Sequence, residues 1–339
     1  MLIVQILLGG ITRLTGSGLS ITEWKPILGA VPPLSESAWN AAFEKYKGIA
    51  QYRYLNAHFT LSDFKSIYFW EWAHREWARL VGVVFIIGFV FFLIRGYFNK
   101  NMIIPFVILF ILGALQGAVG WIMVQSGLND TDLYVSHIRL AIHFMAALVL
   151  LCYTLWFALK LLVPDDERVK QSSFRTFTLA VIVLLCIQLI YGAFMAGLRA
   201  ASVAPTWPTI NGIWLPENVH QYAGHQYEGI SAFTSQPIAV HFIHRALAYI
   251  LFIVVIIWAF AAGNIPSVRL RRWRWWPFAL VMLQVVLGIF TVLNGAHTAT
   301  AGRFGLFELL AESHQLVAMC LLIALICNLY LLRTRTSAG

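Results

Sequence analysis

Charged residues are scarce in this sequence. Asp, Glu, Lys and Arg make up 12% of its 339 residues, whereas 60% are hydrophobic and the mean hydropathy is +0.74. A soluble domain averages about 25% charged residues. A soluble fold this apolar would expose large hydrophobic patches. The composition therefore predicts an all-α polytopic membrane protein, with membrane lipid as its surroundings.

Acidic residues are fewer still, with 15 Asp and Glu against 24 Lys and Arg, for a net charge of +9. In a soluble protein this excess could indicate nucleic-acid binding. Here the basic residues gather in short connections between apolar runs, a pattern typical of membrane topology. We therefore expect no nucleic-acid partner.

Cysteines are few, and none lies in a polar loop or in a Cys-x-x-Cys motif. The four are Cys152, Cys186, Cys320 and Cys327, each inside an apolar run. This placement favours small buried side chains over redox or metal chemistry. A cleavable signal peptide and a transit peptide are also absent from the pattern.

Seven apolar runs approach or exceed the roughly 20 residues that a membrane span needs. They are 72–95, 103–124, 138–162, 174–197, 237–262, 274–295 and 312–332. Met1–Thr12 is an eighth, shorter run. About 14 apolar residues precede Gln188 in the fifth span, but only four precede Gln5 in the first. We expect either a short first helix or a start truncated by roughly ten residues.

The basic connections set the expected orientation. Connections 96–102, 163–173 and 263–273, and the tail with Arg333 and Arg335, are basic and fall on one side of the membrane. That side is predicted to be cytoplasmic, with both termini. The long connections 14–70 and 198–236 then face outward. Within the first, Ser35–Tyr52 is amphipathic, and we expect it on the membrane surface.

A Gln-x-x-x-Gly motif occurs four times, on the odd-numbered spans. The motifs are Gln5–Gly9, Gln116–Gly120, Gln188–Gly192 and Gln284–Gly288. Four histidines occupy the even-numbered spans, namely His74, His143, His244 and His314. The spacing within the two histidine pairs is nearly equal. This common order predicts eight transmembrane helices as two tandem four-helix bundles, 1–162 and 174–339, joined by a cytoplasmic linker, 163–173.

The four histidines are the main functional candidates. Ionisable residues inside spans are costly and usually functional. With a rise of about 1.5 Å per residue, each lies roughly 6–10 Å below the outer surface. Two imidazoles on neighbouring helices suit haem iron, which accepts two axial histidines, whereas zinc needs three or four ligands. A lone histidine in a span can equally be a hydrogen-bonded packing residue, but two matched pairs favour ligation.

Glu71 distinguishes the two halves. It lies three residues before His74, on the same helix face. The matching position in the second half is His241, which could support the neighbouring site. This difference suggests chemistry in the N-terminal half, and electron transfer or structure in the C-terminal half. The alternative is that Glu71 is an interfacial partner of Arg75 or Lys65.

Several arginines lie near the outer ends of the predicted spans. A guanidinium suits the propionates of a haem, which accept bidentate hydrogen bonds. Snorkelling to lipid headgroups is the alternative. These candidates are Arg13, Arg75, Arg79, Arg199 and Arg245.

At these residues the sequence resembles the haem A synthases of the Cox15/CtaA family. The matching stretches cover nearly the whole chain: GGITRLTGSGLSITEWKP (9–26), FWEWAHREWARLVG (69–82), VSHIRLAIHF (135–144), YGAFMAGLRA (191–200), WPTINGIWLP (207–216), FIHR (242–245) and ESHQ (312–315). Some members carry a cysteine pair in an outer loop. This chain has none there, so no redox role for such a pair is expected.

The resemblance implies oxidation of the C8 methyl of haem O to a formyl group, by successive hydroxylation, to give haem A for terminal oxidases. It implies that His74 and His143 flank the substrate haem and that His244 and His314 ligate a haem b. Glu71 matches the family's acidic residue near the reacting methyl.

The resemblance also implies a bacterial cytoplasmic (inner) membrane location, with the haem sites toward the outer face. Haem O synthase is the expected supplier, and a ferredoxin-like protein or a quinol the expected electron donor. It leaves a homo-oligomer open, and also whether one N-terminal ligand dissociates or water attacks an oxidised methyl.

Two other functions fit part of the pattern. A dihaem b electron-transfer protein, such as a quinol oxidoreductase, explains the histidines but leaves Glu71 without a role. It would also usually place its haems at two depths. A haem transporter of duplicated topology explains the repeat but not two matched histidine pairs.

Overall fold

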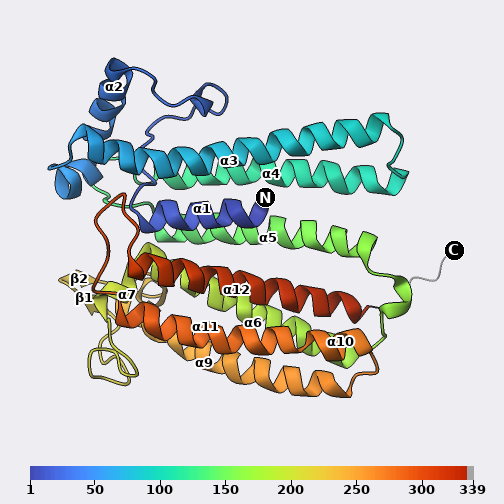
Figure 1. Cartoon of the computed structure of the whole chain (residues 1–339). Coiled ribbons are helices and arrows are strands. Elements are labelled where there is room, and N and C mark those ends of the chain that lie inside the picture. The colour runs from blue at the N-terminus through green and yellow to red at the C-terminus, as the bar shows by residue number, and fades with distance from the viewer. Residues whose placement is uncertain (334–339) are drawn as a thin grey trace. The chain divides into compact units, whose positions relative to one another are not determined.

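The computed structural model describes residues 1–333, so Arg335, one basis of the predicted orientation, lies outside the described residues. These residues form two compact units. Unit 1 comprises Met1–Leu150 with Thr298–Glu312, and unit 2 comprises Leu151–His297 with the described residues from Ser313 onward. The described chain is predominantly helical (Figure 1). Its only sheet pairs strand β1 (Gln221–Tyr222) antiparallel to β2 (His225–Gln226).

Seven helices within residues 1–333 are long and apolar enough to cross a membrane. They are α3 (Leu61–Ile94), α4 (Lys100–Gln125), α5 (His137–Leu162), α6 (Ser172–Gly197), α9 (Pro237–Ala261), α10 with α11 (Val268–Leu293) and α12 (Leu306–Leu331). Helix α1 (Leu2–Leu14) is apolar but shorter. Large apolar side chains on these helices are exposed, for example Ile87 and Ile104. The predicted class, a polytopic all-α membrane protein, agrees with this architecture.

Helix α3 begins well before the predicted span 72–95. Thr60 caps it: its side chain accepts from the Asp63 amide, and the Asp63 carboxylate accepts from the Thr60 amide at 2.9 Å. This reciprocal capping box satisfies two amides that would otherwise lack partners. The helix consequently extends beyond the apolar run, and both Glu71 and His74 lie within regular helix rather than at its start.

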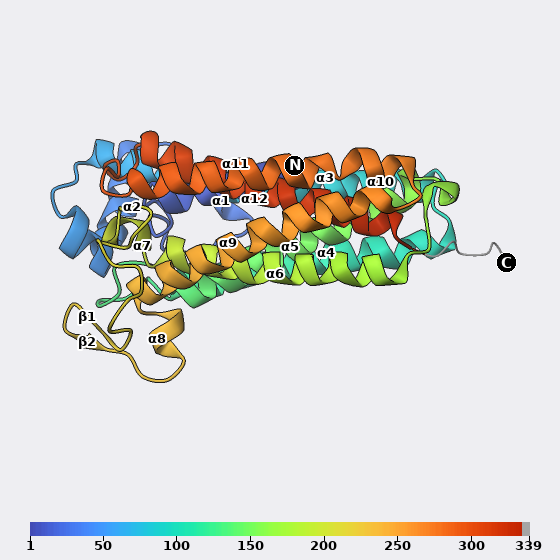
Figure 2. The ribbon, with the colours of Figure 1, turned by 90° about the horizontal axis from the view of Figure 1, so that it is seen from below.

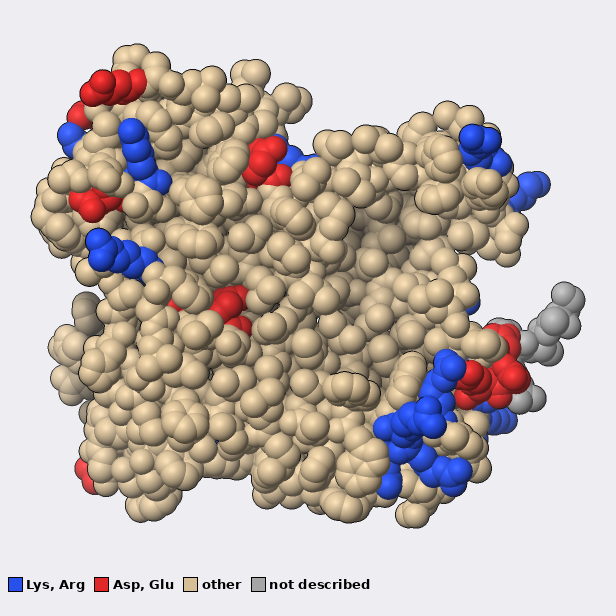
Figure 3. Space-filling view, viewed as in Figure 1, with Lys and Arg blue, Asp and Glu red and all other residues tan. Residues whose placement is uncertain are grey.

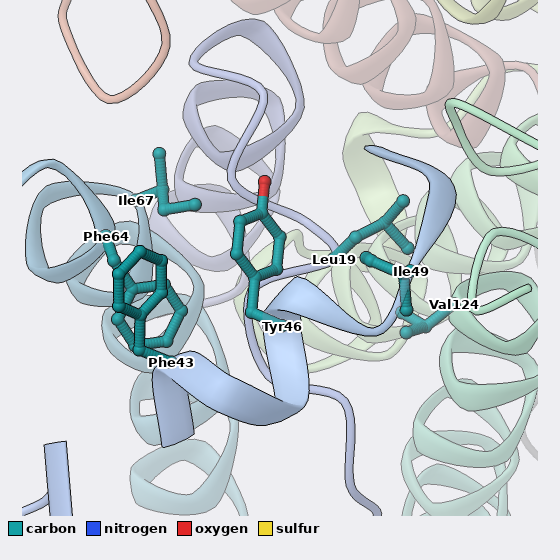
Figure 4. Close-up of a cluster of buried hydrophobic side chains, with 7 residues drawn as sticks. All are labelled: Leu19, Phe43, Tyr46, Ile49, Phe64, Ile67 and Val124. Atoms are coloured by element: carbon teal, nitrogen blue, oxygen red, sulfur yellow. The ribbon is translucent and has the colours of Figure 1, made fainter. Parts of the chain in front are cut away.

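The first long connection folds onto α3 in unit 1. Helix α2 (Glu36–Lys47) is capped by Ser35, which accepts from the Ala38 amide at 3.2 Å. Figure 4 shows the apolar cluster that α2 forms with α3 and neighbouring segments, made of Leu19, Phe43, Tyr46, Ile49, Phe64, Ile67 and Val124. Phe43 and Phe64 stack with ring centroids 5.0 Å apart. The predicted amphipathic helix is present, but its apolar face is buried within the protein.

Unit 2 is centred on α9, which packs against α6 and α11. Trp258 of α9 is fully buried and donates to the Thr178 hydroxyl of α6 at 2.9 Å. The connection that carries α7 (Ala200–Val203), the β-hairpin and α8 (Ser231–Thr234) lies at one end of these helices (Figure 2).

Basic side chains gather at the opposite end of unit 2, around α10 (Val268–Trp273), as Figure 3 shows. Arg269 pairs there with Glu167, and Arg168 pairs with Asp165. The predicted basic connections 163–173 and 263–273 therefore meet at one end of this unit.

Candidate functional site

Each Gln-x-x-x-Gly motif lies against one of the four predicted ligand histidines. A Cβ atom added to the glycine would approach the imidazole to 3.2 Å for Gly9 and His74, 2.8 Å for Gly120 and His143, 3.4 Å for Gly192 and His244, and 3.0 Å for Gly288 and His314. Contacts below about 3.4 Å are tighter than most real Cβ contacts. The motif glycines thus let the imidazoles approach the neighbouring helix backbone.

The glutamines of the motifs contact the same histidines. In unit 1, the side-chain amide of Gln5 donates to the His74 carbonyl oxygen at 3.2 Å. Gln116 donates to the His143 carbonyl oxygen at 2.9 Å, and its Nε2 lies 3.2 Å from His143 Nδ1. Residues four apart share a helix face. One face of each odd-numbered span therefore supplies both a glycine gap and an amide to a histidine.

In unit 2, the amides reach the imidazole rings. Gln188 Nε2 lies 3.2 Å from His244 Nδ1 and 3.4 Å from His244 Nε2. Gln284 Nε2 lies 3.1 Å from His314 Nε2. The side-chain oxygen of each motif glutamine is buried and has no hydrogen-bond partner within residues 1–333.

The two histidines of unit 2 face one another as a pair. The rings of His244 and His314 have centroids 6.5 Å apart, with an angle of 69° between their planes. Two metal–nitrogen bonds of about 2 Å, with about 1 Å more from each nitrogen to its ring centre, span roughly 6 Å. That spacing fits one metal ion held between the two rings. His74 and His143, both half-buried, lie within electrostatic range of each other.

Residues 1–333 offer no metal site built from protein ligands alone that could replace haem in this interpretation. No group of three or more His, Cys, Asp or Glu side chains there could hold a metal ion. Two histidines alone do not complete a zinc site. They do complete the axial positions of an iron whose other four ligands come from a porphyrin. The donor set, the glycine gaps and the ring spacing all fit haem.

Glu71 is 2% exposed and is fully engaged by neighbouring groups. Its Oε2 accepts from the Ser20 hydroxyl at 2.7 Å and from the Ile21 amide at 2.8 Å. Its Oε1 forms an ion pair with Arg75 at 2.6 Å. The ion pair with Arg75 that the sequence offered as an alternative is therefore present, and Glu71 also fixes the segment that follows α1.

Arginines predicted as propionate partners hold loop carbonyls in unit 1. Arg75 donates to the carbonyl oxygens of Ile21 and Glu23 at 3.0 and 3.1 Å. Arg79 donates to those of Lys25 and Pro26 at 3.1 and 2.7 Å, and pairs with Glu76. Arg13 lies in the last turn of α1. These contacts pin the outer connection to α3.

In the second half, too, an arginine on a histidine helix binds carbonyl oxygens of a connection. His241 is fully buried, and its Nε2 accepts from Arg245 Nε at 3.0 Å. Arg245 also donates to the carbonyl oxygens of Thr206 and Thr209, the latter at 3.1 Å. Arg199, a further candidate, lies between α6 and α7. His241 thus occupies the position of Glu71 in structure as well as in sequence, as the partner of an arginine one turn later.

Sequence reasoning missed a buried carboxylate in the second half. Glu312 is 7% exposed and stands two residues before His314. The ESHQ stretch contains it, and its placement inside an apolar run was the available signal. Residues two apart do not share a helix face. Both halves therefore have a carboxylate close in sequence to a histidine. They differ because only Glu71 shares a helix face with its histidine, His74.

Glu23 and Tyr46, both in the outer connection, have displaced pKa values. Hydrogen bonds from Lys25 and then Lys45 lower the pKa of Glu23. Burial raises the pKa of Tyr46, whose hydroxyl contacts Gln51 and Asn56. The hydrogen bonds of Glu23 and Tyr46 lie within the connection that carries Ser20 and Ile21.

Comparison with known proteins assigns the family. The family model COX15-CtaA, described as cytochrome oxidase assembly protein, matches residues 1–326. The chain belongs to this family. It is 42% identical over 295 residues to a haem A synthase of Bartonella henselae, covering 85% of this chain and 80% of that protein. It is 39% identical over 336 residues to a haem A synthase of Bradyrhizobium diazoefficiens, covering 99% and 89%.

A third relative, a haem A synthase of Caulobacter sp., is 43% identical over 299 residues, covering 87% of this chain and 85% of that protein. No solved structure matches the chain. The family expected from the sequence motifs is confirmed.

Proposed function

We propose that this protein is a haem A synthase, which oxidises the C8 methyl of haem O to a formyl group and releases haem A. Membership of the COX15-CtaA family and about 40% identity to proteins named haem A synthase support this function. The observation that carries it in the structure is the set of four imidazoles, each against a glycine of the neighbouring helix, with those of His244 and His314 facing each other.

The two pairs have different tasks in this proposal. His74 and His143 hold the substrate haem O, and His244 and His314 hold a resident haem b. When bound, haem b supplies one-electron transfer toward or away from the reacting site. The presence of Glu71 beside His74 supports this division, because the matching residue of the second half is a histidine, His241, and not a carboxylate.

Glu71 is the proposed catalytic carboxylate. Four residues after it, Arg75 neutralises one of its oxygens, while Ser20 and Ile21 hold the other. These contacts orient the carboxylate. To accept a proton from water or substrate, one oxygen must exchange a present partner for that group. Arg75 and Arg79, with Arg13 and Arg245, are the proposed cations for haem propionates.

The proposed architecture has eight membrane helices in two tandem bundles, 1–162 and 174–339, with linker 163–173. Helix α1 is short, but its Gln5 and Gly9 contact His74 of α3. Each longer odd-numbered span contacts the histidine of the following span in the same way, which supports counting α1 as a span. We place the protein in a bacterial cytoplasmic membrane, with both termini cytoplasmic and the haem sites toward the outer face. Haem O synthase would supply the substrate, and a ferredoxin-like protein or a quinol the electrons.

The function is tested by producing the protein in cells with and without a haem O supply and identifying the extracted haems by mass spectrometry. Haem A is expected only when both the protein and haem O are present. A protein that yields only haem b under a competent electron supply would instead be a dihaem electron carrier. Unchanged haem O accumulating across the membrane would identify a transporter.

A further inference from the structure

The first outer connection contains a short apolar segment, residues 26–34, that lies against helix α3. Its sequence is PILGAVPPL, and charged residues flank it at Lys25 and Glu36. Apolar side chains clustered on a surface indicate an interaction site rather than chance exposure. Four large apolar side chains of the segment are 61–84% exposed, namely Ile27, Leu28, Val31 and Leu34.

Hydrogen bonds fix the position of this segment along α3. Trp72 Nε1 donates to the Ala30 carbonyl oxygen at 2.9 Å, and Arg79 Nε donates to that of Pro26 at 2.7 Å. Trp72 begins the apolar run 72–95, and Arg79 lies about 10 Å further along the helix at 1.5 Å per residue. In Figure 1 the dark blue loop that precedes α2 accordingly lies alongside α3. The segment is therefore level with the outer end of a membrane-spanning run, rather than beyond it.

The face of α3 that carries Arg79 continues into an exposed apolar surface. Val83 and Ile87 follow Arg79 by four and eight residues, so all three share a helix face. Val83 is 50% exposed and Ile87 is 64% exposed. On a helix as long and apolar as α3, such a surface faces lipid. The exposed side chains of segment 26–34 thus extend a lipid-facing surface toward the outer interface.

Much of the segment's polar backbone is satisfied within the protein. The Lys25 carbonyl oxygen accepts from Arg79 at 3.1 Å and from the Gly29 amide at 3.0 Å. The Ala30 amide donates to the Ile27 carbonyl oxygen at 3.2 Å. Three of the nine residues are prolines, which carry no amide N–H. Because an unsatisfied backbone group is costly in lipid, these contacts suit an irregular segment that enters the membrane interface.

We propose that residues 26–34 are immersed in the outer interface of the bilayer, with Ile27, Leu28, Val31 and Leu34 in contact with phospholipid acyl chains. The first outer connection then contacts the membrane through this segment and not through α2, whose apolar face packs within unit 1. The segment follows Ser20 and Ile21, which hold Glu71, so it ties that part of the connection to the bilayer.

The test uses the full-length, haem-loaded protein in phosphatidylcholine vesicles, with Leu28→Cys carrying the polarity-sensitive fluorophore NBD. Ser37→Cys, at an exposed position of α2 in the same connection, is the matched control, and the unaltered protein gives the background from the four native cysteines. We expect the Leu28→Cys label to emit at shorter wavelength than the control. It should be quenched by phosphatidylcholine with a doxyl group on its acyl chain and protected from aqueous iodide, and the Ser37→Cys label should show the reverse.

Arg79→Ala tests whether the contacts with α3 hold the segment at this depth. The change removes the donor to the Pro26 carbonyl oxygen, and a polar group that loses its partner favours water. We expect weaker doxyl quenching and stronger iodide quenching of the Leu28→Cys label. Arg95→Ala, which removes an exposed cation from the opposite end of α3, should leave both unchanged.

Iodide quenching of the Leu28→Cys label as strong as that of Ser37→Cys would overturn the inference, because the segment would then face water. Protection from both quenchers would also overturn it, since a protein surface would then cover the segment. Doxyl quenching that falls as the ratio of protein to lipid rises would identify a second copy of the chain as that cover. Thermal melting of each variant separates these outcomes from misfolding. Haem A formation is measured separately, so failure of the inference and failure of the proposed function are distinguishable.

Discussion

Single residues set the geometry of both candidate haem sites. A glycine four residues after a glutamine places a gap and an amide on one helix face. At Gly120 that gap is tightest, since an added Cβ would lie 2.8 Å from Cε1 of His143. The space that a methyl group would occupy is therefore already filled by the imidazole.

We expect Gly120→Ala to displace His143 and lower the haem content of the N-terminal half by about 10-fold, as loss of ligand orientation does elsewhere. The measurement is haem per protein after purification, with the low-spin spectrum of the remaining haem. Gly117→Ala on the same helix is the matched control, because its added Cβ would meet nothing within 4 Å. Equal haem contents in the two variants would show that the glycine gap does not position the ligand.

The substitution Glu71→Gln removes the charge of Glu71 and its ion pair with Arg75 but can keep other contacts. Glu71→Gln retains the shape of the side chain and an oxygen that accepts from the Ile21 amide, while Arg75 keeps the Ile21 and Glu23 carbonyls. We expect both haems to remain and haem A formation to fall by about 10²–10⁴-fold, the usual contribution of a general base. Loss of the C-terminal haem in this variant would count against the proposed division between the halves.

The sequence predicted part of this residue-scale arrangement. The four histidines and the Gln-x-x-x-Gly motifs stood out because polar residues are rare inside apolar runs. The carbonyl contacts of Arg75 and Arg245 could not be foreseen, because their partners lie more than 30 residues away in irregular connections. Their assignment to propionates and the ligand roles of the histidines stay predictions.

At the scale of elements, each unit uses an arginine on its histidine helix to hold a connection. Arg75 holds the segment after α1, and Arg245 holds the segment after α7. The partner of the arginine differs, Glu71 in one unit and His241 in the other. An arginine therefore holds the connection in both units, whereas a carboxylate partner of that arginine, Glu71, is present only in unit 1.

Arg245→Ala should loosen the connection after α7. It removes the donors to the Thr206 and Thr209 carbonyl oxygens. The Thr209 carbonyl keeps the Thr206 hydroxyl as a donor at 2.9 Å, whereas loss of the donor to the Thr206 carbonyl costs about 1–3 kcal/mol. We expect a lower Tm and faster proteolysis between residues 204 and 230, followed by gel electrophoresis. Arg271→Ala, at an exposed position, is the control. Identical cleavage of the two variants would show that Arg245 does not secure this connection.

Element boundaries followed the apolar runs only where polar caps did not extend a helix. Helix α3 begins before the predicted span 72–95, because the Thr60 capping box starts it with polar turns ahead of the apolar run. The α2 segment was recognised by its periodicity, but its packing on Phe64 and Ile67 depends on contacts distant in sequence. Periodicity identifies an apolar face, and the tertiary fold decides what covers it.

At the scale of the whole molecule, composition alone predicted the membrane class, and seven long apolar helices agree with it. The orientation rests on charge and can be measured. A cysteine placed at Ser37 is expected to react with a membrane-impermeant maleimide on intact cells, and one at Arg271 only after permeabilisation. Both positions are exposed, and the four native cysteines are only half-buried, so a protein without added cysteines sets the background. The reverse labelling pattern would invert the proposed topology.

The central claim is that one histidine pair holds the haem being oxidised and the other holds a resident haem. It is tested most directly by mass spectrometry of the haems that copurify with His143→Ala and with His314→Ala in cells supplied with haem O. We predict that His143→Ala retains haem b and contains neither haem O nor haem A. We predict that His314→Ala loses haem b and still contains haem O. Loss of haem b from His143→Ala, with haem O retained, would contradict the account.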